Sequence, residues 1–388
     1  MASDHETPSA AAARYIAHER FHRTFILPSN ADHEPLTVGY ADVGRAPETS
    51  TGPSPPTVLF MQGMFASRYL GIALHAIAEG LGVRVLVVDR PGMGKSTDVP
   101  LQQRIPIWLE LVPHLLEQLG IKHVALASHS AGTLYLLNTL YHHRDILDPE
   151  RPSVTMLAPW VDSAHSRATS MQMAQYVPVS AFSVWHLIPK FFLVQAGPAL
   201  ATSGTVFTKV SNLVSSGTLG GGQDNSESAK NRRRIEGVYG LPRDVQAEID
   251  TQVFKAMFDE NTVGANSEAL QCLKKGQSWS WGNCEDYETF VRELVIRERD
   301  RRTAGQGNEG SAKLKVTTFF AETDVMIGKK GQVYMETCLR GKDGEFQDVL
   351  DYETHTVSGS DHDSLVQSAA VLEQLFTIAG GIMNSVTE

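Results

Sequence analysis

The chain alternates between short, almost continuous apolar runs and segments whose apolar residues recur three and four positions apart. The runs of the first kind, which suit strands, are 24–27, 36–40, 57–61, 83–88, 123–127, 153–159, 313–320 and about 352–357. The segments of the second kind, which suit helices with one buried stripe, are about 67–81, 109–119, 133–143 and 365–376. Apolar strands separated by amphipathic helices are typical of a parallel sheet that is covered on both faces. The pattern therefore predicts an α/β fold with a doubly wound, mostly parallel sheet.

This alternation stops after residue 162 and resumes at residue 313. The residues between these points, 163–312, contain helical patches and loops but no clear strand. We therefore predict a core built from 24–162 and 313–388, with 163–312 as a helical cap inserted above the sheet. The first 23 residues are expected to form a flexible N-terminal segment.

The composition excludes some classes of protein. Acidic residues outnumber basic ones by 44 to 34, which gives a formal net charge of −10. A nucleic-acid-binding protein would show a basic surface, so nucleic acid is not an expected partner. The three cysteines form no C-x-x-C pair, and residues 1–23 lack the apolar core of a signal peptide. We therefore expect a reducing, cytoplasmic location and a small-molecule, ester-like substrate; the oligomeric state is not indicated.

One segment, 176–200, approaches the length and apolar character of a membrane span. Three prolines at 178, 189 and 198 interrupt it, and Lys190 is its only formal charge. We expect a lid or pocket segment and no spanning helix. Weak contact with a lipid surface is left open as an alternative.

The most informative local motif is Ser128-His129-Ser130-Ala131-Gly132, which follows the apolar run 124–127. A serine with small residues two positions before and two positions after it suits a sharp turn between a strand and a helix. Such a turn is strained and crowded, and it exposes the hydroxyl of the central serine. The motif is a variant of G-x-S-x-G, with Ser128 at the first glycine position. It predicts Ser130 as a nucleophile.

A serine nucleophile needs a base, and the base needs an acid that orients it. Two later strand ends offer such groups: Asp324 follows the run 313–320, and His362 follows the strand that ends near Val357. Functional groups of doubly wound sheets collect beyond the carboxyl ends of strands, so these side chains are expected to meet Ser130. Asp162, after the run 153–159, and Glu322 are the alternative acids.

With the order Ser130, Asp324, His362 the chain resembles the serine-dependent α/β-hydrolase superfamily of esterases, lipases and thioesterases. The turn 89–96, Asp-Arg-Pro-Gly-Met-Gly-Lys-Ser, is similar to the one that follows the family's fourth strand. Family members carry a His-Gly pair after the third strand, where this chain has Gln62-Gly63. The resemblance implies that the backbone N–H groups of Met64 and Ala131 form an oxyanion hole.

The resemblance also implies chemistry that needs no cofactor and no metal. A serine nucleophile favours acyl transfer, whereas an aspartate in its place would imply epoxide or haloalkane chemistry. We expect hydrolysis of a carboxylic ester with an apolar acyl group, with thioester and lactone cleavage as variants. The alternatives are carbon–carbon bond hydrolysis in secondary metabolism and a receptor-like protein that binds a ligand without turnover. The residues assigned to substrate binding are Phe65, His129, Trp160 and Trp185.

Overall fold

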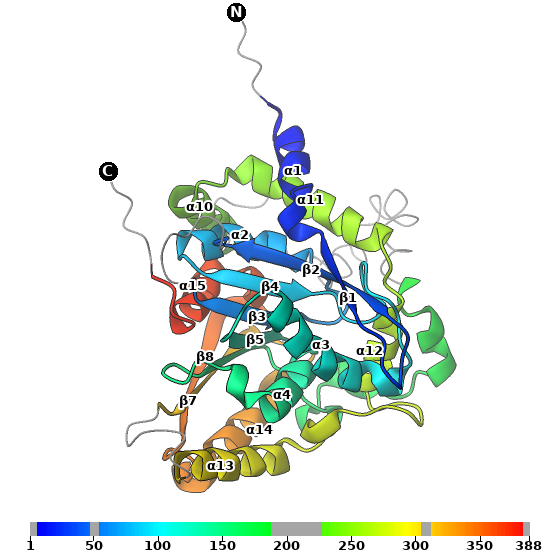
Figure 1. The fold of residues 1–388 in the computed structure, drawn as a ribbon, viewed down its shortest axis with the longest axis vertical. Helices are drawn as coiled ribbons and strands as arrows, with labels where there is room; N and C mark the ends of the chain where they lie inside the picture. Colours follow the sequence, from blue (N-terminus) through cyan, green and yellow to red (C-terminus); the bar gives the residue numbers. More distant parts are fainter. Residues whose placement is uncertain (1–5, 47–53, 188–226, 304–311, 383–388) are drawn as a thin grey trace, which may run out of the picture.

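A central sheet of eight strands organises the computed structural model, which describes residues 6–46, 54–187, 227–303 and 312–382 (Figure 1). The strand order is β1-β2-β4-β3-β5-β6-β7-β8, and β3 to β8 all run parallel to one another. The antiparallel strand β2 joins β1 to this parallel sheet. The strands are β1 (Arg23–Leu27), β2 (Leu36–Gly44), β3 (Thr57–Met61), β4 (Arg84–Val88), β5 (Ala125–His129), β6 (Ser153–Leu157), β7 (Leu314–Thr323) and β8 (Leu350–Asp361). The predicted fold class is confirmed.

Helices cover both faces of the sheet, because the strands β3 to β6 are apolar on both faces. One face packs against α2 (Leu70–Gly80), α15 (Ala369–Ile378), α1 (Pro8–Ile16) and α11 (Arg243–Asp259). The other packs against α3 (Arg104–Gln118), α4 (Gly132–His142), α13 (Tyr287–Thr303) and α14 (Gly328–Arg340). Two apolar cores, one on each face, therefore hold the sheet between layers of helix.

Between β6 and β7 the described residues form helices joined by loops. The helices besides α11 and α13 are α5 (Ser163–Ser166), α6 (Thr169–Ala174), α10 (Glu227–Tyr239) and α12 (Gly264–Cys272). The segment proposed as a lid, 176–200, is described only as far as residue 187, where it contains a short 3-10 helix, Val179–Val184. The rest of that segment lies outside the described residues. No helix in the described ranges is long and apolar enough to span a bilayer.

The expectation of a flexible N-terminal segment over residues 1–23 is wrong for its described part. The helix α1 begins after Thr7, whose hydroxyl accepts a hydrogen bond from the Ala10 amide, and Pro8 occupies its first turn. Ala12 and Ile16 are buried, and α1 lies along α11 (Figure 1). The capping residue, the proline and the run of alanines were signals of this helix in the sequence.

Candidate active site

Ser130 occupies the sharp turn between β5 and α4. Its φ is +50°, a left-handed conformation that costs energy for a side-chain-bearing residue and that places Oγ above the carboxyl end of the sheet. The turn is held by the Ser130 amide, which donates to the Leu157 carbonyl of β6 at 3.0 Å. It is held also by the Thr133 amide, which donates to the Ser130 carbonyl at 3.0 Å.

The small residues around Ser130 are required by close packing. A Cβ at Gly132 would overlap the Met61 carbonyl oxygen at the end of β3, so only glycine fits there. Ser128 is fully buried, and its hydroxyl has no hydrogen-bond partner in the part of the chain that the structure describes. A small side chain, rather than a hydroxyl as such, is what that position needs.

His362 and Asp324 complete a chain of hydrogen bonds that starts at Ser130. The Ser130 hydroxyl lies 2.8 Å from His362 Nε2, and His362 Nδ1 lies 2.8 Å from Asp324 Oδ2. The other carboxylate oxygen of Asp324 accepts hydrogen bonds from the Met326 and Ile327 amides, both at 2.8 Å. Because Asp324 can only accept when ionised, His362 carries its proton on Nδ1 and accepts from Ser130 at Nε2.

The electrostatics of this chain favour a histidine that can take up a proton. Burial is the largest effect on His362 and opposes its charge, but the hydrogen bond and charge of Asp324 outweigh it, so the pKa is raised above 6.5. Burial likewise opposes the charge of Asp324, yet its hydrogen bonds to His362 and to two backbone amides lower the pKa below 3.8. Asp324 is therefore ionised at neutral pH.

The two alternative acids are engaged elsewhere. Asp162 caps α5 by accepting from the Ala164 amide at 2.9 Å, and its second oxygen lies 2.8 Å from Lys274 Nζ. Glu322 accepts from the Gly359 amide at 2.7 Å and so braces the loop that leads to His362. Neither carboxylate contacts the His362 ring in the described structure.

The loop after β3 brings the Met64 amide near the turn that carries Ala131. Neither amide has a hydrogen-bond acceptor among the described residues, so both are free to donate to a bound group. Gln62, which stands in place of the family's histidine, is fully buried and donates from Nε2 to the Val88 carbonyl at 2.7 Å. A Cβ at Gly63 would lie only 2.8 Å from His129 Nδ1, so a glycine is needed for this approach.

His129 and Trp160, both assigned to substrate binding from the sequence, are buried. His129 Nε2 donates to the His362 carbonyl at 2.9 Å and thereby anchors the loop of the candidate base. Burial, and after it the neighbouring charge of His362, lowers the pKa of His129 to about 3. Trp160 donates from Nε1 to the Cys272 carbonyl at 3.1 Å and packs in the core. No local pattern around His129 indicates this anchoring contact.

Phe65 and Trp185, the other two residues assigned to the substrate, come together from distant parts of the chain. Their ring centroids are 6.3 Å apart, and Trp185 also lies 5.4 Å from the ring of Phe182. Phe65 follows the Met64 amide directly and has a φ of +65°. The same part of the insertion exposes several large apolar side chains: Met173, Tyr176, Val179, Val184 and Leu187. Weak contact with a lipid surface stays an open alternative.

Metal binding at this site would compete with the hydrogen-bond chain. His129, His362 and Asp363 are the group in the described ranges whose potential ligand atoms lie within 4.8 Å of one another. Both ring nitrogens of His362 are already bonded to Ser130 and Asp324. A metal ion could use His362 only by displacing one of these partners.

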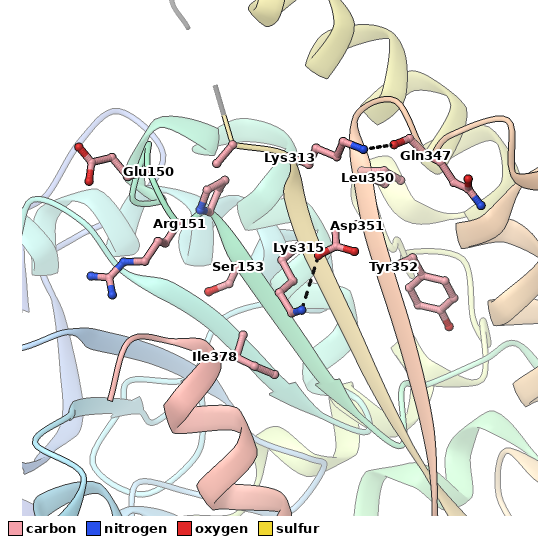
Figure 2. A pocket seen from close by; sticks show the side chains of 12 residues that line it. Glu150, Arg151, Ser153, Lys313, Lys315, Gln347, Leu350, Asp351, Tyr352 and Ile378 are labelled. Carbon is pink, nitrogen blue, oxygen red and sulfur yellow. Dashed lines mark hydrogen bonds and ion pairs between the residues drawn. The ribbon is translucent and has the colours of Figure 1, made fainter. Parts of the chain in front are cut away.

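A cavity of about 690 Å³ lies at the amino ends of β6, β7 and β8 (Figure 2). Ser130 follows the carboxyl end of β5, so it lies at the opposite end of the parallel sheet. Among the charged groups of the cavity, Lys315 lies 3.5 Å from Asp351, and it also lies 3.0 Å from Glu353. This cavity is separate from the candidate active site.

Solved structures share this architecture at low sequence identity. An epoxide hydrolase from Vigna radiata superposes with a TM-score of 0.50 and 15% identity, over 92% of this chain and 98% of that one. A bacterial membrane phospholipase A gives a TM-score of 0.53 and 13% identity, over 97% and 93% of the two chains. No protein-family model matches the sequence. No curated protein matches it either. The chain has the α/β-hydrolase fold.

Proposed function

We propose that the protein is a serine hydrolase that cleaves carboxylic esters through an acyl-enzyme on Ser130. The observation that carries the proposal is the unbroken hydrogen-bond chain from Asp324 through His362 to Ser130, with both distances at 2.8 Å. It stands at the carboxyl end of a parallel sheet, where such folds collect their functional groups. The names of the two similar structures, an epoxide hydrolase and a phospholipase, support hydrolysis as the class of reaction.

The reaction would proceed in two halves. His362 Nε2 accepts the Ser130 proton as Oγ attacks the ester carbonyl carbon, and the Met64 and Ala131 amides stabilise the oxyanion that forms. Collapse of this intermediate breaks the bond to the alkoxide, which leaves as an alcohol with the proton from His362. Water then attacks the acyl-enzyme and gives its proton to His362, and the carboxylic acid leaves as Oγ recovers that proton.

The acyl group is proposed to be apolar. We call the loop after β3, residues 62–65, the oxyanion loop. Together with the insertion it presents the half-buried rings of Phe65 and Trp185, 6.3 Å apart, and the buried ring of Phe182 packs against Trp185 at 5.4 Å. Met64 packs against the same small apolar cluster. An acyl chain that displaces water from these surfaces gains roughly 0.8 kcal/mol for each buried methylene.

The test compares Ser130→Ala with Ser128→Ala on a series of p-nitrophenyl esters of increasing chain length. We expect Ser130→Ala to stay folded and to lose on the order of 10⁴- to 10⁶-fold in kcat. Ser128→Ala is the matched control, because it removes a buried hydroxyl two residues away that has no partner in the described structure. It should keep its activity. A fluorophosphonate probe should label the peptide that contains Ser130 in the wild type and in Ser128→Ala only.

Two outcomes would contradict the proposal. Ser130→Ala that retained roughly a third of the wild-type rate would exclude Ser130 as the nucleophile. Labelling of Ser130 without turnover of any ester in the series would favour a ligand-binding protein or a different scissile bond.

A further inference from the structure

A buried ion pair connects the insertion to the loop that carries the Met64 amide. Arg90 follows β4, and Glu268 lies on α12; their side chains are 0% and 1% exposed. Arg90 Nε lies 2.5 Å from one carboxylate oxygen of Glu268, and Arg90 Nη2 lies 2.9 Å from the other. Arg104 also donates to Glu268, at 2.9 Å. The Glu268 carboxylate is therefore held in one position by hydrogen bonds from two arginines, Arg90 and Arg104.

The remaining donors of Arg90 point at the oxyanion loop. Nη1 donates to the Gln62 carbonyl, and Nη2 donates to the Gly63 carbonyl at 2.8 Å. The Gly63 carbonyl and the Met64 N–H belong to one planar peptide unit, in which they point in opposite directions. Fixing the carbonyl oxygen therefore fixes the direction of the Met64 N–H. A cation at the carbonyl end also polarises the unit and makes its N–H a stronger donor.

The carboxylate of Glu268 keeps the Arg90 guanidinium in place. The planar guanidinium bonds a carboxylate on one side and two carbonyls on the other, an arrangement that lysine cannot reproduce. Burial opposes the charge of Glu268, but Arg90 and then Arg104 outweigh it, so the pKa of Glu268 is lowered below 4.5. A neutral residue at this position would leave two buried arginines without their shared counter-ion.

We propose that Arg90 and Glu268 are positioning residues for the oxyanion hole, with Glu268 acting through Arg90 on the Gly63–Met64 peptide unit. This inference rests on the proposed function, because it presumes that Met64 donates to an oxyanion on the substrate. It assigns to helix α12 of the insertion a part in the chemical step.

The experiment measures ester hydrolysis and inhibition by a trifluoromethyl ketone in Glu268→Gln and Arg90→Lys. The ketone forms a tetrahedral adduct with the serine and places an oxyanion in the hole. We expect kcat to fall by roughly 10- to 100-fold with KM within about threefold, less than the loss of a whole oxyanion donor. The Ki of the ketone should rise by the same factor as kcat/KM falls, since both report the tetrahedral state.

Glu298→Gln is the matched control. Glu298 lies on α13 and is 4% exposed. Its two carboxylate oxygens accept hydrogen bonds from Arg144 Nε and Nη2 at 2.7 and 2.9 Å, a bidentate pair away from the oxyanion loop. The Glu298→Gln change should lower the unfolding midpoint to a similar degree while kcat and Ki stay within about threefold.

The outcomes separate this inference from the proposed function. If Ser130→Ala is active, the proposed function fails. If Ser130→Ala is inactive while folded Glu268→Gln and Arg90→Lys keep kcat and Ki within about threefold, only the positioning role is overturned. If Glu268→Gln does not fold, kcat and Ki of the charge-conserving Arg90→Lys decide whether the positioning role stands. If neither folds, or if Glu298→Gln loses as much activity, the pair serves stability alone and the inference is overturned.

Discussion

Replacing Asp324 with asparagine tests the candidate acid with no change in side-chain size. One carboxylate oxygen accepts from the Met326 and Ile327 amides, and the other faces His362 Nδ1. In Asp324→Asn the amide oxygen must stay with the two N–H donors, because turning the NH₂ group toward them loses two hydrogen bonds of about 1 kcal/mol each. The NH₂ group therefore faces His362 Nδ1.

That orientation puts the imidazole in the wrong tautomer. A donor facing Nδ1 makes this nitrogen an acceptor and moves the proton to Nε2, which then donates to Ser130 and can no longer accept its proton. The imidazolium also loses its counter-ion. Together these changes should lower kcat by roughly 10²- to 10⁴-fold, or about 3 to 5 kcal/mol in activation free energy.

The assay is kcat on a short p-nitrophenyl ester, measured beside two controls. Asp162→Asn removes an ion pair with Lys274, and Glu322→Gln weakens the brace on Gly359; each should stay within about tenfold of the wild type. The reasoning is refuted if Asp324→Asn stays within that range, or if Asp162→Asn shows the large loss instead.

Two further predictions concern pH. The rate should fall as the pH drops through a His362 pKa above 6.5, because only the neutral imidazole accepts the serine proton; a rate that is flat down to about pH 4 would contradict this. Burial, and after it the Arg20 charge, lowers the pKa of His75 to about 3, so the unfolded chain binds a proton that the folded chain excludes. Stability should therefore fall between about pH 6.5 and 3, and His75→Gln should reduce the loss at about pH 4.5 by about 3 kcal/mol in urea denaturation; an unchanged loss would exclude His75 as its source.

The sheet could be predicted from the sequence because its signals are local. Strands β3 to β6 are apolar on both faces and separated by amphipathic helices, so pattern alone locates them within a few residues. Helix α14 was not predicted, although its buried residues Gly331, Met335 and Cys338 have helical spacing. Its two lysines and other polar residues left only a narrow apolar stripe, which the pattern did not reveal.

The candidate site likewise has residues that the sequence could predict and residues that it could not. Ser130, Asp324 and His362 each follow a strand, so topology brings them to one end of the sheet, as the order of motifs predicted. The pairing of Arg90 with Glu268 joins residues 178 positions apart and has no local signal. A buried glutamate in a helix of mixed composition looks like any solvated charge until its partner is known.

Among Asp324, His129 and His362, only His362 is expected to change charge near neutral pH. His129, which holds the His362 carbonyl, has its pKa lowered to about 3 by burial and stays a neutral donor. The Asp324 pKa is lowered below 3.8, so this carboxylate stays charged. Protonation of His362 is then the event that switches the site off, and the acid side of the pH–rate profile should fit a single ionisation. Two overlapping ionisations between about pH 5 and 8 would mean that a second group titrates with His362. That group would be His129, which its burial argues against, or Asp363, whose pKa burial raises above 3.8.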